Sequence, residues 1–339
     1  MSTPSKRFNS PGFWLRLGGT LFTLALLVYL LKEQGWSEIL LALQKITLWQ
    51  FSLALALQLL SRLAITARWH VLLRGAKLPV SFAQSARLTF AGLFATNFLP
   101  TTIGGDVIRL AGAIQLRFDS AISTASLVAD RLVGMAGMAM ALPFGLPAFS
   151  AALSQPTTET IPLAAAVLSR RERYQVTAKK WQGRLNAFLQ RMLHSLQLWI
   201  SHPRSLFQAL GFTWLHMIFL FTSIWLLLNA MGETVSFWSI AGMWSAVYFI
   251  TLIPISINAY GVQELSLAFI FTQVGGVSAS SALSVAILIR TLLMLASLPG
   301  AFFVPGILAA RSSTPAGLSS PDSKEQSPAL DGNAGNTPE

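Results

Sequence analysis

The chain has 339 residues, of which 53% are hydrophobic and only 11% are charged. Its mean hydropathy is +0.57. Soluble domains carry roughly 25% charged residues, so this composition excludes an ordinary soluble protein and indicates a polytopic membrane protein. The net charge of +11 is typical of basic cytoplasmic loops, which set the topology of a membrane protein, rather than of nucleic-acid binding.

Apolar segments long enough to form membrane-spanning helices recur along the chain. A span needs about 20 mostly apolar residues. The segments that meet this requirement are 13–31, 47–67, 126–147, 206–229, 238–256 and 281–307. The first follows basic residues, as in a signal peptide, but no small-residue cleavage site comes after it, so we expect an uncleaved span. A further segment, 148–168, is polar near its start and is expected to be a poor span.

The distribution of basic residues predicts the orientation of the chain. Basic residues precede the first span and follow the second, at Lys6, Arg7, Arg16, Arg68, Arg74, Lys77 and Arg87. The segment 155–204 carries eight basic residues against two acids. Cytoplasmic loops are enriched in lysine and arginine, so we expect all three regions in the cytoplasm. The chain must then cross the membrane an even number of times between the basic residues after the second span and the segment 155–204. This favours a re-entrant segment at 88–113.

Composition also predicts the domain organisation. We expect a cytoplasmic N-terminus over 1–12, a membrane domain over 13–310 with a basic insertion at 170–204, and a tail over 311–339. The tail is rich in small and polar residues and is expected to be disordered. Within the insertion, apolar residues at helical spacing from 181 to 200 predict an amphipathic helix. This helix either rests on the anionic membrane surface or packs against the bundle.

The segment N-F-L-P-T-T-I-G-G-D-V-I-R, from Asn97 to Arg109, interrupts an apolar stretch. Irregular backbone at bilayer depth is tolerated only where other helices bury it or where it lines a wet cavity. A helix that starts at the two glycines would place Asp106 and Arg109 on one face near its N-terminus, where amides and a guanidinium favour phosphate. The alternative is an Asp-Arg pair that satisfies itself and only fixes the start of the helix.

A second interruption, I-P-I-S-I-N-A-Y-G-V-Q-E, runs from Ile253 to Glu264. It repeats the order of the first, with a proline, polar or small residues, a glycine and then an acid. Paired interruptions in two halves of a transporter point to a binding site near the middle of the membrane, between structural repeats. The pattern therefore predicts an inverted repeat. The alternative is chance, because the spacing from proline to acid is six residues in one segment and ten in the other.

Other charged residues also fall within apolar segments. Asp130 and Arg131 precede an apolar run, although charges at a helix end can instead reach the headgroups. Arg62 and Arg290 lie inside predicted spans, so each needs an acidic partner or a wet cavity. The acids of the apolar segments are Asp106, Asp130 and Glu264.

Residues that could bind a metal are scarce. Cysteine is absent, which excludes disulfides and thiolate metal sites. The histidines lack the spacing of metal ligands, and we expect loop or packing roles for His70, His194, His202 and His216. The zinc-protease, P-loop, nucleophile-elbow and dinucleotide-binding motifs are also missing. We therefore expect no cofactor, no metal and a function other than catalysis.

Four motifs occur along the chain in a set order. They are R-W-H-V-L-L from Arg68, N-F-L-P-T-T-I-G-G-D-V-I-R from Asn97, D-R-L-V-G from Asp130, and N-A-Y-G-V-Q-E from Asn258. Together they resemble the lysylphosphatidylglycerol synthase transmembrane-region family, a flippase-like membrane unit also found at the front of the multiple peptide resistance factor. The resemblance covers about residues 10–308. It implies an all-α inner-membrane protein of roughly seven or eight helices, with re-entrant elements, that handles polar lipids or lipid-linked molecules.

The resemblance also implies which residues form the site. The N-x-L-P and G-D-x-x-R positions of the family, its acid-arginine pair and its G-x-x-E fall within these motifs. The candidate substrate-binding residues are Asn97, Asp106, Arg109, Asp130, Arg131, Asn258 and Glu264. The chain departs from the family in carrying N-A-Y at Asn258, where a glycine-rich turn is common. The aminoacyl-transferase activity in the family name belongs to a separate soluble domain, so we do not expect that activity here.

Three functions fit these features. The first is a translocator in the bacterial inner membrane, in which Arg109 and Arg131 hold the phosphate of a phospholipid or lipid-linked substrate while Asp106, Asp130 and Glu264 position these arginines. The second is an intramembrane lipid-modifying transferase with Asp106 or Glu264 as general base. The third is an accessory protein that supports a lipid or polysaccharide synthase without transporting. We favour the first, with a second copy or a lipid-synthesis enzyme as the expected protein partner and with no nucleic acid.

Overall fold

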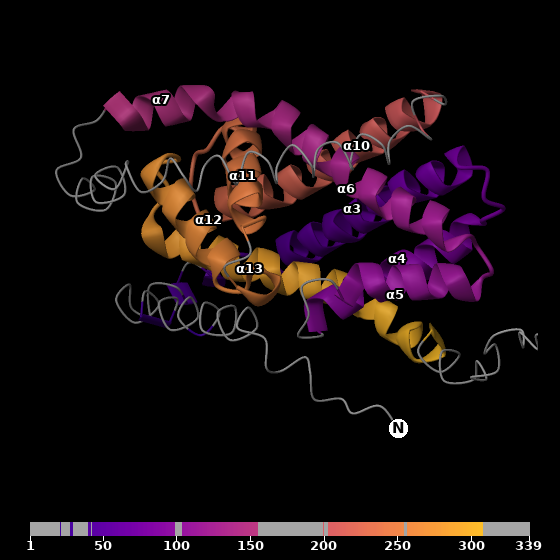
Figure 1. The fold of residues 1–339 in the computed structure, drawn as a ribbon. Coiled ribbons are helices and arrows are strands. Elements are labelled where there is room, and N and C mark those ends of the chain that lie inside the picture. Colours follow the sequence, from indigo (N-terminus) through magenta and orange to yellow (C-terminus); the bar gives the residue numbers. More distant parts are fainter. Residues whose placement is uncertain are drawn as a thin grey trace, which may run out of the picture.

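The computed structural model describes residues 43–98, 104–154, 203–253 and 256–307, together with Leu21, Val28, Tyr29, Leu40, Leu41 and Trp199. This part of the chain is helical and contains no strand (Figure 1), which confirms the expected all-α class. The N-terminal segment 1–12, most of the predicted first span, most of the segments 148–168 and 170–204, and the tail from 311 lie outside the described residues.

Four helical segments within the described ranges are long and apolar enough to cross a membrane. They are α3 (Leu48–Gly75), α6 (Ser120–Ala141) continued by η2 (Leu142–Gly145) and α7 (Leu146–Ser154), α10 (Pro203–Ala230), and α13 (Ala279–Ser297) continued by η4 (Leu298–Phe302). At about 1.5 Å per residue, the 28 residues of α3 or α10 extend about 42 Å, more than the hydrocarbon core requires. These helices confirm four of the predicted spans.

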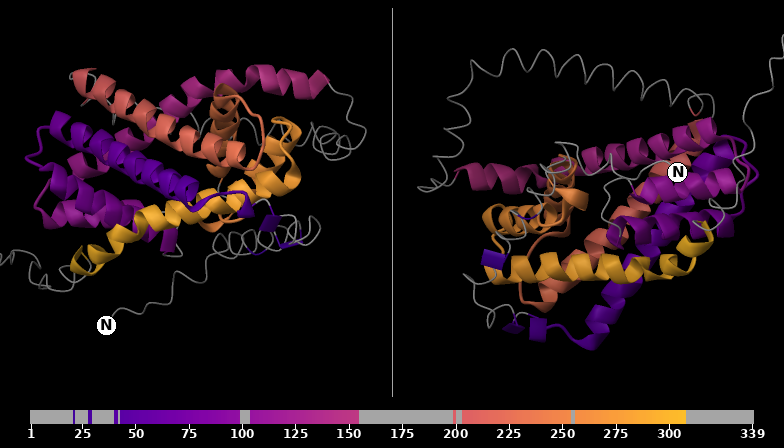
Figure 2. Two further views of the ribbon diagram at one scale, coloured as in Figure 1. Left: turned by 180° about the vertical axis from the view of Figure 1, so that it is seen from behind. Right: turned by 60° about the horizontal axis from the view of Figure 1, so that its bottom comes forward.

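The long helices begin at residues that cap their free backbone amides. Thr47 and Gln50 form a capping box at the start of α3, in which Gln50 Oε1 accepts from the Thr47 amide at 2.9 Å. Asp119 caps α6 by accepting from the amide of Ile122 at 2.8 Å. Helices α3 and α10 then lie side by side over much of their length (Figure 2).

Two pairs of shorter helices form hairpins that enter the bundle from opposite ends (Figure 1). The first pair is α4 (Phe82–Phe98) and α5 (Gly104–Gln115), and the second is α11 (Phe237–Thr251) and α12 (Val262–Gln273). The outer ends of the first pair, at Val80 and Phe118, belong to one hydrophobic cluster. Those of the second pair pack at Val235 and Val277, in a different cluster. This opposed arrangement is the one that an inverted repeat would give.

The first hairpin surrounds the predicted interruption, which confirms that 88–113 is not one continuous helix. Its two arms approach closely, since a Cβ added at Gly105 would lie 2.6 Å from the carbonyl oxygen of Gly92. Glycine is therefore required at this crossing, because a larger residue would separate α4 from α5. The residues from Leu99 to Ile103, including Pro100, lie outside the described residues.

The second hairpin corrects the prediction of a full span over 238–256. Helix α11 has 15 residues, about 22 Å at about 1.5 Å per residue, and it ends at Thr251. After the short helix η3 (Ile257–Ala259), the chain returns as α12. The turn contains positive φ angles at Asn258 (53°), Ala259 (55°) and Gly261 (77°). Residues in this left-handed conformation cannot belong to a right-handed helix, so α11 and α12 cannot join into one continuous span.

Basic residues gather at one end of the bundle, where α3 passes into α4, α5 passes into α6, and α10 begins. They are Arg74, Lys77, Arg87, Arg117 and Arg204. At the other end, Lys45 Nζ donates to the carbonyl oxygen of Met231 at 3.1 Å and so ties the start of α3 to the end of α10. The enrichment of cytoplasmic loops in basic residues would place that end in the cytoplasm, which stays a prediction.

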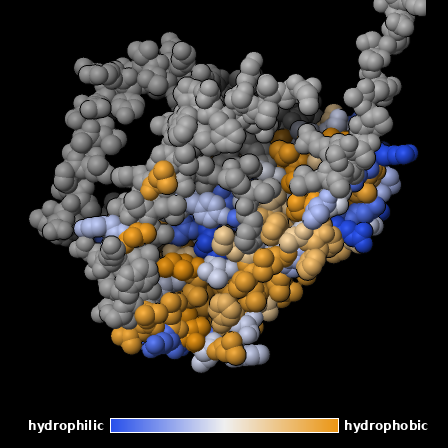
Figure 3. Space-filling model, turned by 90° about the horizontal axis from the view of Figure 1, so that it is seen from below, coloured by the Kyte–Doolittle hydropathy of each residue, from blue (hydrophilic) through white to orange (hydrophobic). Residues whose placement is uncertain are grey.

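The described surface is apolar over large areas (Figure 3). Exposed large apolar side chains include Leu63, Phe207, Trp225 and Phe269, which are 41%, 73%, 40% and 58% exposed. Such side chains suit contact with lipid. The predicted amphipathic segment 181–200 has one described residue, Trp199, which is fully buried and donates from Nε1 to the carbonyl oxygen of Leu72 at 2.9 Å. At that residue the segment packs against the bundle.

Candidate functional site

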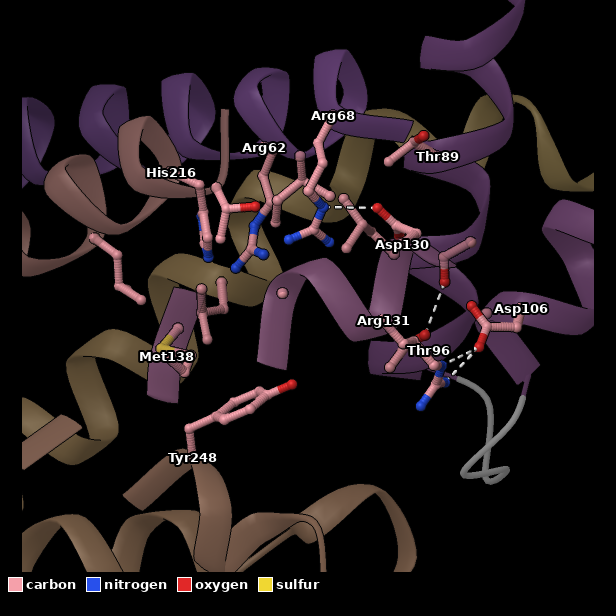
Figure 4. A pocket seen from close by; sticks show the side chains of 18 of the residues that line it. Arg62, Arg68, Thr89, Thr96, Asp106, Asp130, Arg131, Met138, His216 and Tyr248 are labelled. Atoms are coloured by element: carbon pink, nitrogen blue, oxygen red, sulfur yellow. Dashed lines mark hydrogen bonds and ion pairs between the residues drawn. The ribbon is translucent and has the colours of Figure 1, made fainter. Parts of the chain in front are cut away.

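A cavity of about 350 Å³ lies inside the bundle, walled mainly by α3, α4, α5, α6, α10 and α11. Its charged lining residues come from α3, α5 and α6: Arg62, Arg68, Asp106, Arg109, Asp130 and Arg131 (Figure 4). Arg62 and Asp130 sit near the middle of their long helices, and α5 begins beside the cavity at Gly104. The polar cavity therefore lies between the ends of the bundle, at about the level of the middle of α3.

Asp130 is the centre of a buried ion-pair network. Arg68 Nε donates to Asp130 Oδ1 at 2.6 Å, and both Nη atoms of Arg109 donate to Oδ2 at 3.1 Å. Asp130 is 2% exposed, and Arg68 and Arg109 are each 8% exposed. The Arg109 guanidinium also stacks on the Trp69 ring, 4.1 Å from the ring centre. One carboxylate thus orients two arginines, and such pairing offsets the cost of placing charges in an apolar bundle.

Asp106 forms a second, more open pair. Arg131 Nε donates to Asp106 Oδ2 at 2.6 Å, and a second nitrogen of Arg131 contacts the same oxygen. Arg109 Nη1 lies farther from Asp106, at 3.6 Å. The predicted i,i+3 pair on α5 is therefore present, but the hydrogen bonds of Asp106 go to α6. The Arg131 side chain is 59% exposed, so it is the accessible guanidinium of the network.

Glu264 belongs to a separate ion pair. Its Oε1 accepts from Arg290 Nε of α13, and its Oε2 accepts from the amide of Gly261 at 2.8 Å. The prediction that Glu264 positions Arg109 and Arg131 is wrong, because α12 directs this carboxylate towards α13. The neighbouring residue Gln263 lines the cavity instead. Of the two environments expected for Arg290, an acidic partner or a wet cavity, the structure shows the acidic partner.

Asn97 and Asn258 join the two interruptions rather than lining the cavity. Asn258 Nδ2 donates to the carbonyl oxygen of Thr96 at 2.7 Å, and the Tyr260 hydroxyl donates to that of Asn97. The Asn97 side chain in turn donates to Ser297 Oγ at 2.9 Å. These bonds confirm that the two helix breaks meet inside the bundle. A direct role of either asparagine in substrate binding stays a prediction.

Several polar cavity residues were not among the predicted site residues, and Arg68, His216 and Tyr248 are examples. Arg68 was expected in a cytoplasmic loop, and this is wrong because α3 continues to Gly75 and carries Arg68 into the bundle. His216 has the expected packing contact, with Ser61 Oγ 2.6 Å from its Nδ1, yet it also lines the cavity. Tyr248 likewise lines it. A lone polar residue in an apolar helix gives no sequence signal that separates packing from a site.

The family of the chain follows from comparison with known proteins. The family model of the lysylphosphatidylglycerol synthase TM region matches residues 16–300, which include every charged residue of the cavity. Comparison with curated proteins gave no match. The apolar helices agree with the membrane location of this family. The chain is thus a multi-pass membrane protein and belongs to the lysylphosphatidylglycerol synthase TM region family.

Proposed function

We propose that the protein translocates an anionic polar lipid, either a phospholipid or a lipid-linked molecule, across the bacterial inner membrane. The observation that carries this proposal is the ion-paired cavity at mid-height, between hairpins that enter from opposite ends. Ionised side chains inside a membrane bundle are costly, and they usually mark a substrate or ion pathway. Interrupted helices that meet at the middle of the membrane are typical of transporter binding sites.

The geometry favours Arg131 over Arg109 as the contact for a lipid phosphate. Both Nη atoms of Arg109 are occupied by Asp130, and its face is covered by Trp69. Arg131 is the more exposed partner of an open pair with Asp106, so a phosphate can compete for its guanidinium. In this proposal Asp106 holds Arg131 ready when the cavity is empty, and Asp130 keeps Arg68 and Arg109 in place.

Passage of the lipid requires the cavity to open towards each side of the membrane in turn. The two hairpins touch at the Thr96–Asn258 and Asn97–Tyr260 hydrogen bonds, at the base of each break. Movement of one hairpin relative to the other at these contacts would expose the cavity to alternate sides. We prefer translocation to catalysis because Asp106, Asp130 and Glu264 are all engaged by arginines, which disfavours a general base at these positions.

Reconstitution of the purified full chain into vesicles tests this function. We expect fluorescent phosphatidylglycerol or fluorescent phosphatidic acid, each tested separately, to change leaflet faster in protein-containing than in protein-free vesicles. Arg131→Gln should slow this movement by about tenfold, the effect of one lost charge-assisted hydrogen bond. Arg74→Gln, an exposed arginine on α3 outside the cavity, is the matched control and should keep the wild-type rate.

Two results would count against translocation. Wild-type protein that moves neither lipid faster than it moves in protein-free vesicles would remove the proposal. Mass spectrometry of the recovered lipids supplies the second test, since a new lipid species formed by wild type and lost in Asp106→Asn would favour the transferase alternative. Unchanged lipid composition together with faster movement is the expected outcome.

A further inference from the structure

Arg62 is the cavity arginine that no carboxylate neutralises within the described ranges. The ion pairs found there engage Arg68, Arg109, Arg131 and Arg290. Arg62 lines the cavity, and its Nε is buried without a hydrogen-bond partner. A guanidinium without a carboxylate partner in the middle of an apolar helix is costly, so an anionic ligand at this position would offset that cost.

Among the described lining residues, the surroundings of Arg62 supply hydrogen-bond donors, and the two aspartates pair with other arginines. Figure 4 shows Arg62 and Arg68 pointing from α3 into the same hollow, with His216 beside Arg62 and the hydroxyl of Tyr248 directed into the hollow from the other side. Arg68 is held by Asp130, on the side away from His216. The part of the cavity around Arg62 is therefore positive and faces an open space.

The charge balance of the cavity indicates the kind of anion that fits. Its described lining contains four arginines and two aspartates, which leaves two positive charges in excess. A phosphate monoester carries a charge of about −1.5 to −2 at pH 7, with three strong acceptor oxygens. A phosphodiester carries a single negative charge and would leave the cavity positive. The monoester therefore balances the lining better than the diester does.

We propose that the cavity selects a lipid with a terminal phosphate monoester, and that Arg62 binds this phosphate at the inner end of the cavity. This inference rests on the proposed function, because it names the class of lipid that the cavity would take. Arg131 would contact the same headgroup from the exposed side. Arg62 then contributes affinity for the second negative charge, which a phosphodiester lacks.

Equilibrium binding to the purified full chain in detergent tests the inference. The probes are dihexanoyl phosphatidic acid, dihexanoyl phosphatidylglycerol and inorganic phosphate. We expect wild type to bind phosphatidic acid at least about tenfold more tightly than phosphatidylglycerol, and Arg62→Gln to abolish this preference. Arg62→Lys, which keeps the charge but not the planar fork, should retain part of it. Arg74→Gln is the control on the same helix and should bind as wild type does.

The outcomes separate the possible failures. Equal affinity of wild type for the two lipids, or an Arg62→Gln variant that keeps the preference, would overturn the inference even if lipid movement in vesicles is normal. Inorganic phosphate that binds as tightly as phosphatidic acid, with the same dependence on Arg62, would overturn the assignment to a lipid. Absence of lipid movement by wild type would remove the translocation proposal alone, because binding is measured without transport. Thermal unfolding of each variant confirms that the protein is folded.

Discussion

Asn258 donates a hydrogen bond from Nδ2 to the carbonyl oxygen of Thr96 at 2.7 Å, across 162 positions of the sequence. This bond joins the turn between α11 and α12 to the last turn of α4. A helix that ends inside an apolar bundle leaves backbone carbonyls without partners, and each costs free energy unless another group donates to it. The second interruption thus helps to satisfy the first, because Asn258 and Tyr260 donate to carbonyl oxygens at the end of α4.

Two substitutions at Asn258 separate this hydrogen bond from the backbone strain at the same residue. Its φ of 53° suits glycine, so Asn258→Gly should lose mainly the bond, at a cost of about 1 kcal/mol. Asn258→Ala should cost about 1–2 kcal/mol more, because alanine is strained in this conformation. Unfolding in detergent measures both effects. Equal stability of wild type and Asn258→Gly would show that the bond does not contribute.

Removal of the charge on Asp130 should destabilise the protein more strongly. Asp130→Asn leaves Arg68 and Arg109 without their buried carboxylate, and breaking such a network costs about 3–5 kcal/mol. Asp119→Asn on the same helix is the control, because asparagine caps a helix about as well as aspartate. Thermal unfolding should therefore separate the two variants clearly. Similar stabilities would mean that the network is not important for folding.

The pair of Glu264 and Arg290 should behave as a coupled unit. In Glu264→Gln the side chain can still accept from the Gly261 amide. The Arg290 guanidinium loses its carboxylate partner, however, and this should destabilise the protein by about 3 kcal/mol. Adding Arg290→Met removes the stranded charge and should restore part of the loss. A double-mutant cycle based on unfolding free energies measures this coupling. Strictly additive effects would argue against the pair.

Glycine substitutions test the close approach of α4 and α5. Gly105→Ala would place a Cβ 2.6 Å from the carbonyl oxygen of Gly92, so we expect a loss of about 1–3 kcal/mol from overpacking. Gly211 in α10 has no atom within 4 Å of such a Cβ, so Gly211→Ala should instead stabilise the helix by about 0.5–1 kcal/mol. Unfolding temperatures that shift in opposite directions are the expected result.

Much of this fold could be predicted from local features of the chain. The apolar runs gave four long helices, and the glycines, Asn258 and the charges after them located both interruptions. The start of α5 at Gly104, with Asp106 in its first turn, also followed from the motif. These features can be predicted from the sequence because hydrophobic periodicity and helix breaking depend on residues close together in the chain.

The pairing of the charges depended on how the helices pack. Asp106 lies three positions from Arg109, yet it hydrogen-bonds to Arg131 on another helix. Glu264 resembles Asp106 in its motif, yet it faces Arg290 rather than the cavity. The rotation and crossing of helices decide which side chains meet, and sequence distance carries little information about either. For the same reason, the chain alone did not reveal that Arg62, although recognised as needing a partner, lies in a polar cavity with no carboxylate beside it in the described structure.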